Sequence, residues 1–308
     1  AMELGFLRDR ILFNTSWYRN RSGNQLDGFN LPSTTGFSSY QANLPALVQN
    51  KGWEFELNTI NLKDGNINWS TSLNITIPKN KLISFPGLDK SSYANMYIEG
   101  KSINIIQGFH FLGINQDNGV AAVEDLNGDG IYTRLSSSNN QGGDYIVIGN
   151  TDPNWYAGIN NSINYKRLEL QVFFQYTSQE GYNLIRQIGG FGLGNTWTTF
   201  ADYWRQPGDI TSTPKPFSTV NINTVNYAVS DATVSNTSFL RLKTLSLSYI
   251  LPISSHNIGV KSLRAYVQGQ NILTFTGYKG YDPEQTSASA TLAIPPIKML
   301  TIGLQASL

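Results

Sequence analysis

Residues 67–77 alternate between large apolar side chains and small polar ones along their whole length. The apolar set is Ile67, Trp69, Leu73, Ile75 and Ile77, with Thr71 among them. Because successive strand residues point to opposite faces, the segment predicts a strand with one apolar and one polar face. The polar face carries amides and hydroxyls instead of Lys or Glu. Its length matches the roughly 9–11 residues with which a tilted strand crosses a bilayer.

The same alternation recurs and predicts an all-β fold, a transmembrane antiparallel barrel to which this chain contributes about nine strands. The expected strands are 2–7, 11–20, 48–62, 67–77, 155–165, 168–178, 239–251, 262–275 and 297–308. In segment 239–251 the alternation changes phase near Lys243 and Thr244, and a β-bulge is one explanation. On the apolar faces, four tryptophans near strand ends are expected to anchor the barrel at the lipid interface. They are Trp17, Trp53, Trp69 and Trp155.

The connections between these strands alternate between short and long. The short ones are 7–10, 63–66, 165–167 and 252–261, and the long polar ones are 20–49, 78–154, 179–237 and 276–296. Strict alternation places all the long loops at one end, as in outer-membrane barrels with short periplasmic turns and long extracellular loops. An odd number of strands leaves two open edges, which lipid does not tolerate. We therefore expect further strands, in the same polypeptide or in another chain, to close the barrel.

Composition narrows the class of protein. Only 14% of the 308 residues are charged, against about 25% in typical water-soluble domains. The net charge of +1 and the absence of a Lys/Arg cluster predict no nucleic-acid partner. The chain has no cysteine, which excludes disulfides and thiolate metal sites. It has no run of 18 apolar residues that could form a membrane-spanning helix, and no signal peptide, so we expect it to begin inside a longer protein.

Four ordered motifs point to one family. They are EDLNGDG at 124–130, IGNTDP at 148–153, SFLRLK at 238–243, and VQGQNILTFT at 267–276 followed by YKGYDPE at 278–284. Together they resemble the C-terminal portion of SusC/RagA-type TonB-dependent transporters of the Bacteroidetes outer membrane. Segments 19–26 and 49–54 fit the same family. The resemblance covers essentially the whole chain.

This resemblance implies a barrel of about 22 strands with a plugged lumen. Residues 1–308 would be the C-terminal portion with the last strands, and the plug domain and N-terminal strands would lie outside this chain. It also implies energised import of an oligosaccharide or oligopeptide across the outer membrane. A SusD-like surface lipoprotein would capture the cargo, and TonB would pull on the plug. No cofactor is implied.

Residues 125–130 have the spacing of a calcium-binding loop. Asp125, Asn127 and Asp129 occupy positions 1, 3 and 5, and the Ile131 carbonyl would serve position 7. Position 12 is Ser136 instead of the bidentate Glu, and no flanking helices are evident. A bound Ca²⁺ and an Asx-rich extracellular turn are therefore both open.

A second candidate site lies in the loop 179–237. Its aromatic residues and a neighbouring cation could bind sugar rings or peptides; they are Trp197, Phe200, Tyr203, Trp204 and Arg205. The alternatives are a local cluster that packs the loop, or contact with the capping lipoprotein.

We find no pattern that predicts an enzyme. Glu54 and Glu56 share a strand face and lack the opposed geometry of glycosidase carboxylates, so we expect them to line the lumen and pair with Arg or Lys. His110 and His256 are isolated, and the glycine-rich segment 189–194 follows no parallel strand that would make it a phosphate-binding loop. Two other functions remain open, a passive porin-like or adhesin barrel and an outer-membrane hydrolase.

Overall fold

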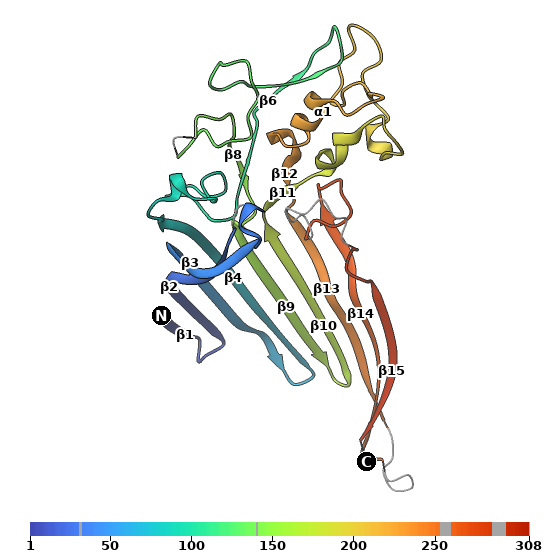
Figure 1. The fold of residues 1–308 in the computed structure, drawn as a ribbon. Helices are drawn as coiled ribbons and strands as arrows, with labels where there is room; N and C mark the ends of the chain where they lie inside the picture. Colours follow the sequence, from blue (N-terminus) through green and yellow to red (C-terminus); the bar gives the residue numbers. More distant parts are fainter. Residues whose placement is uncertain (31–32, 140, 253–259, 285–293, 308) are drawn as a thin grey trace.

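The computed structural model describes residues 1–30, 33–139, 141–252, 260–284 and 294–307. Nine strands form one antiparallel sheet in which each strand pairs with the next one along the chain. They are β1 (Met2–Phe6), β2 (Ile11–Asn30), β3 (Ser39–Asp64), β4 (Ile67–Ser84), β9 (Trp155–Tyr165), β10 (Leu168–Ser178), β13 (Phe239–Leu251), β14 (Ser262–Thr276) and β15 (Met299–Ser307). Figure 1 shows this sheet as a curved wall, with the longer connections gathered at one end.

The connections at that end contain three small two-stranded sheets, β5–β8, β6–β7 and β11–β12. Their strands are β5 (Ile105–Gly108), β6 (Phe111–Ile114), β7 (Ala121–Val123), β8 (Ile146–Asn150), β11 (Glu180–Tyr182) and β12 (Val234–Asn236). The helices are α1 (Ile222–Tyr227) and the 3₁₀ turns η1 (Ser33–Thr35), η2 (Leu88–Lys90), η3 (Leu184–Gly190), η4 (Thr198–Phe200) and η5 (Asp231–Thr233). No helix among the described residues has the length and apolar character needed to cross a membrane. We call this part of the molecule, residues 85–154 and 179–238, the loop assembly.

All nine predicted strands are present, and three of them have the predicted bounds: β9, β10 and β13. The prediction of a loop at 20–49 is wrong, because β2 and β3 continue to pair as far as Asn30 and Ser39. One face of the β3 extension is packed, with Leu44 buried and Ala46 and Val48 beside it, but these residues are too few and too small to stand out in the sequence. A register shift between Gly23 and Gln25, with Asn24 at φ 53°, bends this extension.

The phase slip in segment 239–251 is a β-bulge, as predicted. The register of β13 against β14 shifts between Leu242 and Thr244, which leaves Lys243 without a partner position. The same bulge appears against β10, between Phe173 and Phe174. Alternation is restored on either side of it, so Leu242 and Leu245 both face the apolar side.

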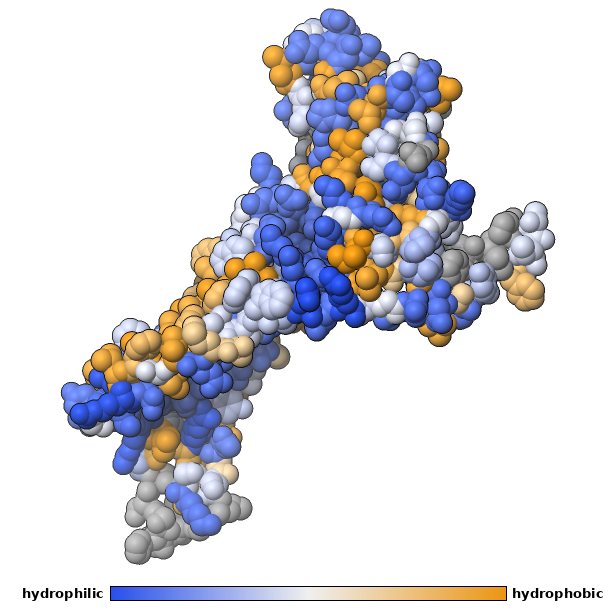
Figure 2. Space-filling model, turned by 90° about the vertical axis from the view of Figure 1, so that its left-hand side faces the viewer, coloured by the Kyte–Doolittle hydropathy of each residue, from blue (hydrophilic) through white to orange (hydrophobic). Residues whose placement is uncertain are grey.

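Strand register joins the apolar residues of neighbouring strands into one continuous face. Across the sheet, Phe13 pairs with Leu57, Leu57 with Leu73, and Leu73 with Ile159. Farther on, Leu247 pairs with Leu170 and Val267. In Figure 2 orange, hydrophobic side chains gather along the sheet part of the molecule. The predicted alternation of an apolar and a polar face is confirmed by these pairings.

Aromatic side chains bound the apolar face at two levels. The level toward the loop end contains Trp17 and Trp53, which pair with each other, and Trp53 also pairs with Ile77. The other level, near the tight turns, contains Trp69. Between Ile77 and Trp69 the strand advances about 27 Å at roughly 3.4 Å per residue. At a tilt of about 40° this corresponds to roughly 20 Å of height, close to the apolar band of about 25 Å in outer-membrane barrels.

A group of four polar side chains interrupts the apolar face near the tight turns. Asn161 accepts hydrogen bonds from Trp69 Nε1 (3.1 Å) and Thr71 Oγ1 (2.7 Å), and Asn61 Nδ2 donates to Thr71 Oγ1 (2.7 Å). Asn61 Oδ1 in turn accepts from Thr59 Oγ1 at 2.8 Å. Polar atoms in contact with hydrocarbon are costly unless they are paired with one another. The network therefore makes these residues compatible with an apolar environment.

On the polar face, aromatic rings lie across glycines of the adjacent strand. Tyr18 pairs with Gly52, and a Cβ at Gly52 would come within 2.7 Å of its hydroxyl oxygen. Tyr266 covers Gly303 in the same way, with 2.5 Å to the ring. Such pairs compensate for the missing side chain and fix strand register.

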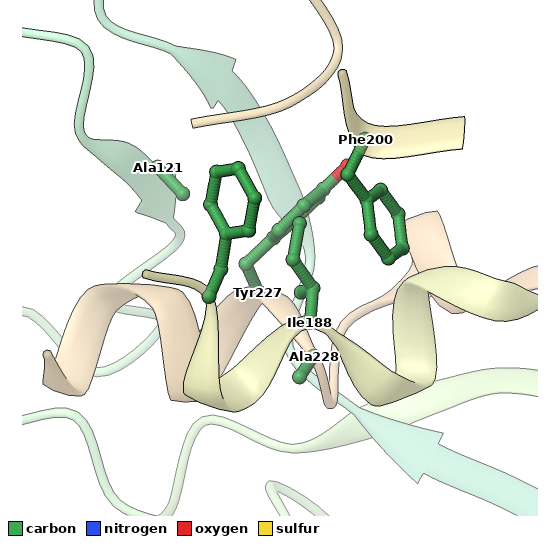
Figure 3. Packing of buried hydrophobic residues seen from close by; sticks show 6 residues of the cluster. Ala121, Ile188, Phe200, Tyr227 and Ala228 are labelled. Atoms are coloured by element: carbon green, nitrogen blue, oxygen red, sulfur yellow. The ribbon is translucent and has the colours of Figure 1, made fainter. Parts of the chain in front are cut away.

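The buried apolar side chains lie mainly in the loop assembly and the strand ends next to it. One cluster consists of Ala121, Ile188, Phe191, Phe200, Tyr227 and Ala228. Figure 3 shows the side chains of Ile188, Tyr227 and Phe200 converging, from separate segments. A second cluster joins Leu44, at the loop end of β3, to Leu82, Phe85, Leu88 and Tyr93. The loop assembly thus has cores of its own.

Candidate functional site

The acidic loop 125–130 is closed by hydrogen bonds of its own. The carboxylate of Asp125 accepts from the backbone N–H groups of Gly128 and Gly130, both at 2.8 Å. Asn127 Oδ1 accepts from the N–H of Asp129, and Asp129 Oδ1 accepts from the N–H of Ile131. The two glycines have φ near +75°, which Gly adopts without strain. These contacts make a series of Asx turns.

The sequence analysis did not indicate Asp144, a buried carboxylate that binds backbone groups of this loop. Asp144 is 2% exposed and accepts from the N–H groups of Leu126 (2.9 Å) and Thr133 (2.7 Å). It lies outside the 12-residue spacing of a calcium loop, so no motif pointed to it. Its position shows that residues 126–133 are ordered by a partner distant in sequence.

The calcium prediction for Asp125, Asn127, Asp129 and Ile131 stays a prediction. Within the described residues, no group of three or more His, Cys, Asp or Glu side chains could hold a metal. The oxygens that would face an ion already accept backbone hydrogen bonds. We infer that Ca²⁺, if it binds, adds to a turn that is already formed. Equilibrium dialysis with radioactive Ca²⁺ tests this, and no retention above that of Asp129→Ala would exclude the site.

The structure brings the predicted aromatic residues 197–205 together, and two of them are core residues. Phe200 and Trp204 are 3% and 8% exposed. The indole N–H of Trp204 donates to the carbonyl of Gln116 at 2.9 Å, and its ring covers Gly119, where a Cβ would come within 2.3 Å. These rings pack the loop assembly, which is the alternative that the sequence left open.

The other three residues of this set are more accessible. Arg205 lies over the ring of Tyr203 at 4.6 Å and donates to the carbonyl of Ala201. Trp197 donates to Gln187 at 2.9 Å and meets the ring of Tyr281 edge-on, with 5.3 Å between centroids. Substrate contact by Trp197, Tyr203, Trp204 and Arg205 stays a prediction, and Tyr281 is a neighbour of Trp197 that the sequence did not indicate.

The charged residues of the SFLRLK and YDPE motifs form a cluster at the junction of sheet and loops, in which Arg241 and Asp282 are buried. Arg241 on β13 is 1% exposed and donates to Asp282 and Glu284, each at 2.6 Å, and to Thr274 Oγ1 at 3.1 Å. Its guanidinium also lies 5.0 Å from the ring centroid of Phe239. This cluster, which we call the Arg241 clamp, fixes the segment after β14 against the polar face of the sheet.

From the clamp, residues 276–284 extend to the loop assembly. Tyr278 donates its hydroxyl to the carbonyl of Tyr182 at 3.1 Å, and Gln179 Nε2 donates to the carbonyl of Pro283 at 2.7 Å. Segments nearly 100 positions apart in the sequence are thus joined here. The motifs were visible in the sequence, whereas their mutual contact was not.

Glu54 and Glu56 line the polar face, as predicted, in a cavity of about 550 Å³. Their expected pairing with Arg or Lys is wrong, since no ion pair of the described residues includes either of them. Glu54 accepts instead from Ser16 at 2.9 Å, and Glu56 accepts from Asn58 at 2.8 Å. The hydroxyls and amides opposite them satisfy these carboxylates without a cation.

His110 is less isolated than the sequence suggested, and His256 lies outside the described residues. His110 Nδ1 lies 2.6 Å from Asp231, whose other oxygen accepts from the N–H of Phe111. The hydrogen bond to Asp231, followed by its negative charge, raises the pKa of His110 above its ordinary value. Nearby, burial raises the pKa of Tyr227 to about 12, so its hydroxyl stays protonated and donates to the carbonyl of Ser212. The His110–Asp231 pair joins the two long connections, whereas the Tyr227–Ser212 hydrogen bond lies within the second one.

No family model matches the chain, but individual proteins do. TonB-dependent receptor P26 of Formosa agariphila is 30% identical over 92% of this chain and 30% of its own length. TonB-dependent receptor SusC of Bacteroides thetaiotaomicron is 23% identical over 99% of this chain and 31% of its own length. Among solved structures, the RagAB peptide transporter matches with a TM-score of 0.80 at 23% identity, covering 99% of this chain and 34% of that one. The chain therefore spans about one third of the length of the proteins that it matches.

Proposed function

Because this chain is related to the SusC- and RagA-type TonB-dependent receptors and has the fold of part of such a β-barrel, we propose that it forms the C-terminal wall of an outer-membrane transporter. The proposed activity is TonB-dependent import of a large nutrient, an oligosaccharide or an oligopeptide. The single observation that supports it most is the sheet itself. Its apolar face is continuous, its opposite face is polar, and the long connections 85–154 and 179–238, as far as the structure describes them, lie at one end.

Other parts of the transporter would come from outside residues 1–308. β1 and β15 are the two edges of the sheet in the described residues, and each pairs on one side only. We infer that further strands pair with both edges, and that a plug fills the space facing Glu54 and Glu56. TonB would act on that plug, and this chain would contribute wall and extracellular loops.

A SusD-like surface lipoprotein is the proposed partner of the loop assembly. This assembly is large, has cores of its own and lies at the end opposite the tight turns. A surface that must hold a second protein needs such preformed structure, since ordering flexible loops on binding costs affinity. The relatives' names are those of receptors and a transporter, which supports a role in binding and transport instead of catalysis.

The experiment uses cells that carry the complete gene containing this segment. Uptake of fluorescent oligopeptides and oligosaccharides is measured in the wild type, in a strain lacking the gene, and after collapse of the inner-membrane proton gradient. Energised import predicts that the deletion and the uncoupler each abolish uptake of one cargo class. Uptake that persists after uncoupling would indicate a passive barrel, and unchanged uptake in the deletion strain would refute transport of these cargoes.

A further inference from the structure

A cavity of about 380 Å³ lies where four segments of the loop assembly meet residues 277–280. Its volume falls in the range of about 300–1,000 Å³ that is typical of ligand sites. Leu184, Ile185, Phe200 and Tyr278 supply apolar and aromatic walls, and Ser235 and Lys279 supply polar groups. We call it the Lys279 pocket.

The walls of this pocket are fixed in advance. Asn183 caps η3 by accepting from the N–H of Ile185 at 2.9 Å, and its amide donates to the carbonyl of Ala232. Phe200 is part of the buried cluster shown in Figure 3. On the opposite side, Tyr278 is tied to Tyr182 by its hydroxyl. A site that is rigid before binding loses little entropy when a ligand enters.

The charge balance around the pocket favours an anion. No Asp or Glu lines it, and Lys279 is exposed and forms no ion pair with any residue that the structure describes. The nearest acids along the chain, Asp282 and Glu284, pair with Arg241, and Glu284 also pairs with Lys243. These two cations balance the two negative charges, so neither acid needs Lys279.

A hydroxyl without a partner adds to this polarity. Ser235 Oγ is buried and has no hydrogen-bond partner among the described residues. A buried hydroxyl without a partner is destabilising. Rotation of the Ser235 side chain about χ1 toward the pocket would let a ligand oxygen or nitrogen pair with it. The apolar walls beside these groups suit the carbon skeleton of a small unit.

We propose that the Lys279 pocket binds the carboxylate-bearing end of an oligomer, with the anion at Lys279 and the adjoining unit against Leu184, Ile185 and Tyr278. Two sources share this chemistry, the C-terminus of a short peptide and a uronic acid. The proposal deepens the proposed function because it names a subsite for its cargo. It is tested by binding alone, so failure of energised uptake leaves it standing, and failure of binding leaves uptake standing.

The experiment uses the complete transporter polypeptide, purified in detergent, and calorimetric titration. The probes are acetyl-Leu-Gly-Gly as free acid and as amide, and tri-galacturonate and its methyl ester. We expect at least one free acid to bind about tenfold more tightly than its neutral form, the size of a charge-assisted contact of roughly 1.4 kcal/mol. Preference for the peptide acid or for the uronate identifies the source.

Three variants make the test specific. Lys279→Met should abolish the preference for the free acid, whereas Lys63→Met, in a tight turn at the other end of the sheet, should preserve it. Gly277→Leu should weaken binding of both forms, since a Cβ there meets no atom within 4 Å and the added side chain narrows the pocket without a clash. Equal affinity for acids and neutral forms, or an unchanged preference in Lys279→Met, would overturn the proposal.

Discussion

The nine-stranded sheet and the loop assembly differ in where their apolar side chains go. The loop assembly buries them in cores, including Phe109, Ile188 and Tyr227, each at most 1% exposed. The sheet leaves its large apolar side chains on the surface, with Trp17, Trp53 and Leu300 at 48%, 48% and 70%. A surface of this kind is typical of contact with lipid or with further protein.

This difference teaches that the two regions are stabilised by different surroundings. Packing inside the protein holds the loop assembly, whereas hydrocarbon outside and neighbouring strands at both edges must hold the sheet. Substitutions should therefore act locally. A change in one region should leave the other intact, except at the Arg241 clamp where the two are joined.

The largest effect is expected at the Arg241 clamp. Arg241→Met leaves the buried Asp282 without its cation, while Glu284 keeps Lys243 at 3.3 Å, and removing one partner of a buried ion pair costs about 3–5 kcal/mol. We expect residues 276–284 to detach and become sensitive to protease while the barrel stays folded, as measured by limited proteolysis of the complete protein in detergent.

The matched control for this change is Arg264→Met. Arg264 pairs with Glu169 at 3.0 Å, but both side chains are about one third exposed. Exposed pairs contribute about 1 kcal/mol or less, so the control should leave proteolysis nearly unchanged. Equal protection in both variants would show that the clamp does not hold the segment.

A smaller effect is expected from a charge on the apolar face. Leu73→Arg should impair barrel assembly by about 2–4 kcal/mol if Leu73 lies near the bilayer midplane. Asn68→Ser, on the polar face of the same strand, should leave folding intact. Heat-modifiability on gels reports the folded fraction of the complete protein. Equal tolerance at the two positions would contradict the assignment of the faces.

The smallest effect concerns pH and the loop assembly alone. The pKa of His110 is raised in the folded protein by Asp231, so the pair stabilises most fully below the unfolded value of about 6.5. This stabilisation is lost as the pH rises through the higher folded value. The pair is half-exposed, so we expect less than about 1 kcal/mol.

Hydrogen exchange of the N–H of Phe111, which Asp231 binds, measures this change. Its protection should fall between acidic and alkaline pH, after correction for intrinsic exchange, and His110→Gln should remove the dependence. The same dependence in the variant would assign it to another group.

The sequence predicted the sheet better than the loops, for a physical reason. A strand between lipid and water must alternate, so the faces, the tight turns and the bulge at Lys243 could be read from period-two patterns. In the hairpin extension of β2 and β3, only Leu44 and its small neighbours Ala46 and Val48 pack on one side, and so short a pattern did not mark a strand. The contact of Arg241 with Asp282 and Glu284 could not be predicted from the motifs alone. It depends on how the chain turns after β14, which the sequence did not reveal.

The candidate sites show the same limit. The spacing of Asp125, Asn127 and Asp129 correctly marked a turn, yet Asp144 supports it from a position that no motif includes. The aromatic cluster at 197–205 was visible as a composition, but which rings face inward depends on neighbours such as Gln116 and Gly119. Lys279 is part of the YKGYDPE motif, but the sequence did not indicate it as a binding residue. Whether a lysine lacks an ion-pair partner depends on its neighbours in space.

The glycines opposite Tyr18 and Tyr266 affect how far these rings project from the polar face of the sheet. Each phenol is laid flat against its neighbouring strand only because that strand offers bare backbone beneath it. A methyl group at either glycine would push the ring away from the sheet. In the proposed transporter, the clearance for cargo along this wall would therefore depend on the smallest residues of the sheet.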